Sequence, residues 1–131
     1  MRRETELWLR QAQADFATAK QLLDDGIYYA SVFFAHQSAE KALKALWIHR
    51  KAELAPWTHN LVSLVRELGG GEALVDDAAE LAPEYILTRY PTPEVALPQE
   101  LYSRRSAEVH LQAAQRIVGW VREEIDKTRE A

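Results

Sequence analysis

The sequence predicts an all-α protein, an up-and-down antiparallel four-helix bundle with one additional short helix. Its long stretches repeat apolar residues at steps of three and four, which is the period of a helix with one buried face. No stretch shows the alternating apolar and polar residues of a β-strand. Because helices joined by short links pack as antiparallel neighbours, we expect one helical domain over residues 1–131.

The stretch from Tyr28 to Arg50 is predicted to be the central helix. It contains no glycine or proline and is rich in alanine and leucine, the strongest helix formers. Apolar residues cover most of its circumference, as in a helix packed on several sides. Its narrow polar strip holds Gln37, Lys41 and Lys44. With these charges inside, the helix is too polar for a membrane span.

A first helix is predicted over residues 4–25, with Gly26 as its C-terminal cap. The members of its apolar stripe are Trp8, Ala12, Phe16, Ala19 and Leu23. The few residues between this helix and the central one favour an antiparallel hairpin of the two. A short helix over 61–68 follows, capped by Thr58 or Asn60.

The remaining helices are predicted over 72–88 and from Ser103, as a cap, to about residue 127. Pro83 lies inside the first of these two, where a proline costs about 3 kcal/mol. We therefore expect a kink or break near 81–83. Three prolines in 89–98 exclude regular structure there. This stiff loop is predicted to be either a surface connector or a functional segment.

The 131-residue composition fits one folded domain, with 47% apolar residues and a net charge of −4. That charge gives no global attraction to nucleic acid or to an anionic membrane, although it allows a local basic patch. The chain has no cysteine, so disulfides and thiolate metal sites are excluded. Its first residues lack the apolar core of a signal peptide, and a cytoplasmic protein without membrane association is expected.

Two histidines are candidates for polar contacts on or near the central helix. His36 lies one turn from Glu40 and could pair with it, although a satisfied core or interface histidine is the simpler interpretation. No second His or Glu is spaced to complete a metal site, so no metal or cofactor is expected. His59 belongs to the run 57–60, for which we expect helix capping and a buried Trp57.

Arg105 and His110 have the spacing of an arginine that binds phosphate and a histidine that acts as acid or base. Metal-independent RNA cleavage uses such a pair. Five positions on one regular helix turn about 500°, which separates the two side chains by about 140°. The pair would work better across a helix start or across a dimer, and solvated positions on a helix face are the simpler interpretation.

Arg89 and Tyr90 form a second candidate site, because a guanidinium fork binds phosphate and a tyrosine ring stacks on a base. Lys41 and Lys44 would add positive charge if the 89–98 loop folds across the central helix. The alternative is that Arg89 only caps the carbonyl groups of the preceding helix.

Three segments resemble the motifs of HEPN domains, the nucleotide-binding domains named for higher eukaryotes and prokaryotes. They are the helix 33–46, the run 58–61 with the leucines that follow, and the run 88–91 ahead of a proline-bearing loop and a final amphipathic helix. The three occur in family order over about residues 7–121.

The resemblance implies a four- or five-helix bundle that is commonly a homodimer. Many small bacterial members are encoded beside a minimal nucleotidyltransferase, with which they act as a toxin–antitoxin or substrate-binding pair. Several are RNases whose Arg-x4–6-His motif lines a dimer cleft. This sequence departs from that motif: no histidine follows Arg89 within six residues, and Gln112 stands two positions beyond His110, where the family commonly has a tyrosine.

Three hypotheses follow. The first is a non-catalytic or weakly catalytic dimer that partners a nucleotidyltransferase and binds nucleotide or RNA at Arg89, Tyr90, Lys41 and Lys44, with His36 and His59 nearby. The second is a metal-independent endoribonuclease toxin that uses Arg105 and His110. The third is a helical interaction module without a ligand.

Overall fold

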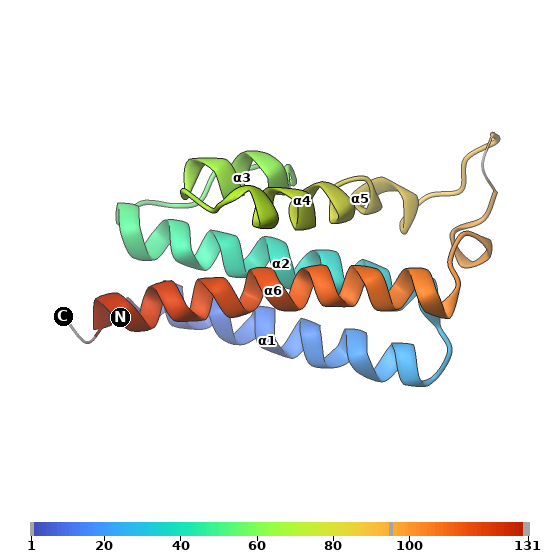
Figure 1. Ribbon diagram of the computed structural model, residues 1–131, viewed down its shortest axis with the longest axis horizontal. Helices are drawn as coiled ribbons and strands as arrows, with labels where there is room; N and C mark the ends of the chain where they lie inside the picture. Colours follow the sequence, from blue (N-terminus) through green and yellow to red (C-terminus); the bar gives the residue numbers. More distant parts are fainter. Residues whose placement is uncertain (1, 95, 130–131) are drawn as a thin grey trace.

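The long helices α1 (Arg3–Asp24), α2 (Tyr28–Lys51) and α6 (Arg104–Arg129) lie side by side along the molecule (Figure 1). The shorter helices α3 (Leu61–Glu67), α4 (Glu72–Leu81) and α5 (Glu84–Leu87) follow one another along one side of this trio. A short 3₁₀ helix, η1 (Pro98–Glu100), precedes α6. This computed structural model describes residues 2–94 and 96–129, and within them extended structure is limited to one isolated bridge between Thr92 and Ala96. The predicted all-α bundle with an extra short helix is confirmed.

Helix α2 is central, as its apolar circumference predicts. It contacts α1, α3, α5, α6 and η1. The core that these contacts bury includes alanines with no exposed area, namely Ala35, Ala39, Ala42 and Ala45. Small side chains on α2 allow its neighbours to approach closely, and the larger Leu43 and Leu46 are fully buried beside them.

The helix ends are set by the residues that the sequence marks. Gly26 has φ +77°, and the N–H groups of Gly26 and Ile27 donate to the carbonyl groups of Leu23 and Leu22, which closes α1 in a Schellman motif. The Asn60 side chain accepts the Ser63 N–H at 3.1 Å and caps α3. At the start of α6, the Ser103 hydroxyl accepts the Ser106 N–H at 3.2 Å.

Pro83 breaks the predicted fourth helix in two. Helix α4 ends at Leu81 and α5 begins at Glu84, because a proline has no N–H to continue the hydrogen-bond ladder. The break brings the short helix α5 against α2. Residues 88–94 and 96–103, which include η1, lie at the end of the molecule opposite to the start of α1 and the end of α6 (Figure 1). Among the described helices, none is long and apolar enough to cross a membrane.

Candidate functional site

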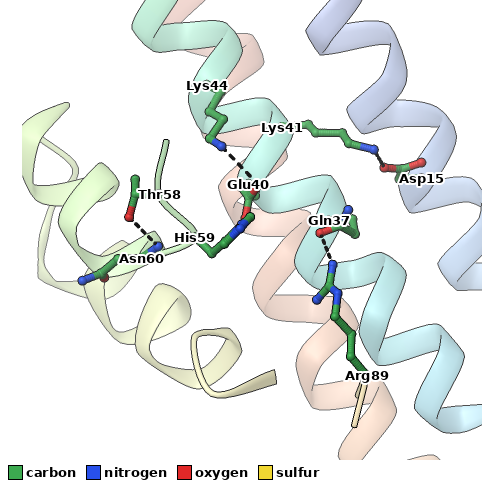
Figure 2. Close-up of polar contacts among 9 residues, drawn as sticks. All are labelled: Asp15, Gln37, Glu40, Lys41, Lys44, Thr58, His59, Asn60 and Arg89. Atoms are coloured by element: carbon green, nitrogen blue, oxygen red, sulfur yellow. Dashed lines mark hydrogen bonds and ion pairs between the residues drawn. The ribbon is translucent and has the colours of Figure 1, made fainter. Parts of the chain in front are cut away.

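A row of polar side chains runs along one side of α2, and each charge in it has a partner (Figure 2). Lys41 Nζ lies 2.6 Å from Asp15 Oδ2 on α1, and Asp15 is only 4% exposed. Lys44 Nζ lies 3.3 Å from Glu40 Oε2 one turn away, and both residues are buried. Any anion that binds either lysine must therefore compete with a carboxylate already in place.

Glu40 connects α2 to the loop that precedes α3. His59 Nδ1 lies 2.8 Å from Glu40 Oε1, while Lys44 holds the other carboxylate oxygen (Figure 2). A buried carboxylate with two charge-assisted partners fixes both of them in place. The pairing of Glu40 with His36 that the sequence suggested is therefore corrected: the partner is His59, nineteen positions along the chain.

The Tyr85 ring of α5 is the centre of a stack of rings and charges. His59 lies nearly parallel to it, with ring centroids 3.7 Å apart and an interplanar angle of 18°. The Arg89 guanidinium carbon lies 4.0 Å from the Tyr85 centroid and 4.4 Å from that of Phe33. Two groups that close to one ring must occupy its opposite faces. The order of the stack is therefore His59, Tyr85, Arg89 and Phe33.

The Arg89 guanidinium is also fixed in its own plane by hydrogen bonds. One terminal nitrogen donates to the Tyr85 carbonyl oxygen at 2.7 Å, and the other donates to Gln37 Oε1 at 3.1 Å (Figure 2). The first bond is the capping contact expected from the sequence, and the second joins α5 to α2. These two bonds use two of the five N–H donors of a guanidinium. The arginine thus caps the helix and still has donors for an anion.

His36 lies beneath this surface and is fully buried, with ring nitrogens that make no hydrogen bond. Its ring is tilted against Tyr85 at a centroid distance of 5.8 Å. Burial lowers the pKa of His36 to about 4, and the charges of Arg89 and His59 add to the effect while Glu40 opposes it. The sequence placed His36 among the ligand-binding residues, and the structure places it fully buried against Tyr85.

Arg105 and His110 do not converge in the structure. Arg105 is exposed, whereas His110 is 8% exposed, its Nδ1 lies 2.6 Å from the Ser106 carbonyl oxygen, and its Nε2 lies 3.8 Å from Glu84 Oε2. Burial raises the pKa of Glu84. His110 therefore faces the interior of the chain, close to a buried carboxyl group.

Two aromatic residues near the stack are exposed. Tyr90 follows Arg89 and is 55% exposed. Trp57 is 100% exposed, so the expectation of a buried aromatic at the start of α3 is wrong. The reason is local: Asn60 alone caps the helix, and the chain before it leaves α2 through Ala52 in a left-handed conformation with φ 57°. The loop from Ala52 to Asn60 carries Trp57 outward.

This surface combines a guanidinium fixed by two hydrogen bonds with buried ion pairs and with exposed rings beside them. In the part of the chain that the structure describes, no group of three or more His, Cys, Asp or Glu residues could hold a metal ion. We call Arg89, Tyr85, Phe33 and Gln37, together with the Glu40–His59–Lys44 cluster, the α2–α5 site.

The comparisons with known proteins decide the family. The HEPN domain matches residues 5–125, which is most of the chain. The chain belongs to the HEPN domain family. A comparison with curated proteins finds no match.

Solved structures agree with this assignment. A Thermus thermophilus protein of known crystal structure is 34% identical, with a TM-score of 0.84 over 93% of this chain and 98% of that one. An archaeal HEPN homologue is 30% identical, with a TM-score of 0.81 over 95% and 99%. An HEPN domain protein of Thermotoga maritima is 28% identical, with a TM-score of 0.71 over 91% and 97%. All three share the fold over nearly their whole length.

Sequence reasoning named some of the residues that the structure brings together in the candidate α2–α5 site and did not name others. Arg89, Lys44 and His59 were named from their chemistry, and all three lie in the α2–α5 site. Tyr85 and Phe33, which clamp Arg89, were missed as site residues. Tyr85 stands four residues before Arg89, so the helical spacing of the two was a signal that could have found it.

Proposed function

We propose that this HEPN protein binds nucleotide or RNA at the α2–α5 site and does so as the partner of a minimal nucleotidyltransferase in a two-component, toxin–antitoxin-like system. The observation that carries the proposal is the Arg89 clamp. A guanidinium held between two rings and by two hydrogen bonds loses little entropy when it binds a phosphate. The partner is supported by family membership, since many small bacterial HEPN proteins are encoded beside such enzymes.

Substitution of Arg89 by lysine tests the ligand. Lysine keeps the charge but loses the planar fork and the stacking between Tyr85 and Phe33. We expect the Kd for a fluorescently labelled single-stranded RNA, and for ATP, to rise about tenfold, which corresponds to about 1.4 kcal/mol. The exposed Arg66 on α3, changed to lysine, is the matched control and should bind as the original protein does.

Circular dichroism and thermal melting of both variants separate lost binding from lost fold, because Arg89 also caps α5. If a folded Arg89→Lys variant binds both ligands with unchanged affinity, Arg89 does not contribute to the binding site. A folded protein that binds neither nucleotide nor RNA would favour the interaction module without a ligand.

The partner and the homodimer are tested on the full chain. Affinity capture of the tagged protein from its native host, read by mass spectrometry, should recover a small nucleotidyltransferase in near-stoichiometric amount. Light scattering at micromolar concentration should give the mass of a dimer. Capture of the tagged protein alone would contradict the two-component proposal, and a monomer mass would contradict the dimer.

The ribonuclease hypothesis has a separate test. It requires RNA cleavage that is lost when His110 is replaced by alanine, while RNA binding that depends on Arg89 is retained. A protein without measurable cleavage of single-stranded RNA would contradict it. The buried position of His110 beside Glu84 makes a thermal melt of the variant a necessary control.

A further inference from the structure

A pocket of about 210 Å³ lies between α1, the end of α2 and the loop before α3, outside the residues that the α2–α5 site uses for phosphate. Its lining combines two indole rings with aliphatic side chains and one cation, in the set Trp8, Lys44, Ile48, Leu54, Ala55, Pro56 and Trp57. Trp57 is 100% exposed, Leu54 is 84% exposed and Trp8 is 36% exposed. This much apolar surface around one hollow is typical of a binding site.

The backbone builds this pocket by the way α2 ends. Ala52 adopts the left-handed conformation, which turns the chain back along α2. The Thr58 N–H then donates to the Pro56 carbonyl oxygen at 2.9 Å, which forms a tight turn around Trp57. His59, two residues later, is fixed by Glu40. The exposed indole is therefore carried on a short loop with an anchored end.

The size and chemistry of the pocket favour a single planar ring. Its volume is below the roughly 300 Å³ at which pockets for drug-sized ligands begin, so a whole nucleotide would not be enclosed. Indole rings stack on every type of base, because each base has a π-face. Lys44 Nζ lies 5.9 Å from the Trp8 ring centroid and supplies the only charge in the lining.

The pocket is continuous with the α2–α5 site through Lys44. That residue lines the pocket and also contacts Glu40, which in turn holds His59 against Tyr85. A single-stranded chain whose phosphate lies at Arg89 would therefore pass the Tyr85–His59 stack and Lys44 on its way to Trp57. Alternating phosphate and base contacts of this kind are how proteins hold single-stranded nucleic acid.

We propose that the Trp8–Trp57 pocket receives an unpaired nucleobase of single-stranded RNA, stacked on the exposed indole of Trp57. The proposal rests on the RNA-binding function proposed above, and it adds a base subsite to the phosphate contacts of Arg89. The competing occupant, an apolar protein surface that includes a second copy of this chain, is an outcome of the test.

The first experiment observes the pocket without any phosphate. The indole N–H groups of the four tryptophans give separate signals in a ¹⁵N correlation spectrum, and the variants Trp8→Phe and Trp57→Phe assign two of them. On titration with adenosine, we expect the Trp8 and Trp57 signals to shift. The part-buried Trp47 and Trp120 lie outside the lining and serve as internal controls. Shifts that are absent, or equal for all four, overturn the proposal.

The second experiment compares an intact RNA oligonucleotide with an abasic one of the same length. We expect the intact RNA to bind more tightly, and Trp57→Ala to weaken it by about fivefold to a hundredfold, the range for a lost stacking ring. The same variant should leave the abasic affinity unchanged. Ile86→Ala, another exposed apolar residue outside the pocket lining, is the matched control.

The two proposals fail in different ways. Suppose that intact and abasic RNA bind with equal affinity, that Trp57→Ala does not change this affinity and that Arg89→Lys reduces it. This outcome overturns the base subsite and supports the phosphate site at Arg89. If adenosine shifts the Trp8 and Trp57 signals but Arg89→Lys leaves the RNA affinity unchanged, the base subsite is supported and Arg89 does not bind the phosphate. A Trp57→Ala variant whose mass falls from dimer to monomer while its RNA affinity is unchanged shows a protein interface, which overturns the subsite.

Discussion

At the scale of single residues, polar side chains buried in the core lower the free energy of unfolding. His36 is the clearest case, because its ring is fully buried and burial disfavours the charged form of an imidazole. The ring supports Tyr85, and Tyr85 in turn supports both His59 and Arg89. The buried polar group that lowers the stability of the fold thus lies directly beneath the residues that we propose to bind the ligand.

His36 makes stability depend on pH. Its pKa is about 4 in the folded protein against 6.5 for a free histidine, so the unfolded chain binds the proton first as the pH falls. The stabilisation from the neutral ring is complete above pH 6.5 and is lost as the pH falls toward 4. At its steepest this loss is about 1.4 kcal/mol per pH unit.

A His36→Leu variant should therefore lose less stability between pH 6.5 and 4 than the original protein. Chemical denaturation at a series of pH values measures the slope. Leu43→Val, a core change without a titrating group, controls for general destabilisation and should shift the curve without changing its slope. Parallel curves for His36→Leu and the original protein would contradict the assignment.

At the scale of elements, the ends of the helices could be predicted from the sequence because residues at or beside each end determine it. Gly26, Pro83 and Ser103 act through their own backbone or side-chain chemistry, and each acts where it was predicted to. The site was less readable because it joins distant segments. Nothing near Glu40 in the sequence indicates His59 as its partner, since the path of the intervening loop decides that contact.

Trp57 shows the same limit. A tryptophan beside a helix cap suggests an anchor buried under the helix start, yet here the ring is fully exposed. The end of α2 determines this outcome, through a left-handed Ala52 that no sequence signal marks. A glycine at that position would have indicated the turn, whereas an alanine reads as one more helical residue.

That alanine gives a prediction about the end of α2. The left-handed conformation costs a residue with a Cβ about 1–2 kcal/mol, and glycine adopts it freely. Ala52→Gly should therefore stabilise the protein by about 0.5–1 kcal/mol, measured as an increase in Tm of a few degrees. Ala17→Gly, at an exposed position inside α1, is the opposite control and should destabilise by about 1 kcal/mol. A decrease in Tm for Ala52→Gly would contradict the strain assigned to this residue.

At the scale of the whole molecule, stability is uneven. Helix α2 contacts α1, α3, α5 and α6 and is the most enclosed element. Helix α5 has only four residues, and two of the three that are not buried, Ile86 and Tyr85, lie at least partly in solvent. Few buried apolar contacts characterise the parts of a protein that open first. The element that carries Tyr85 and leads into Arg89 is thus the weakest of those that frame the site.

Amide hydrogen exchange should resolve this difference. We expect amides in the middle of α2 to exchange only through global unfolding. Those of α5 and of residues 89–94 should exchange through local opening with a much smaller free energy. Denaturant distinguishes the two routes, because global unfolding exposes far more surface and depends strongly on its concentration. A saturating RNA ligand that contacts Arg89 should slow exchange in α5, since binding to the closed form adds to the free energy of opening. The Arg89→Lys variant should lose that protection and keep the slow exchange of α2. Protection in α5 equal to that in α2 without ligand would contradict the predicted local opening of α5.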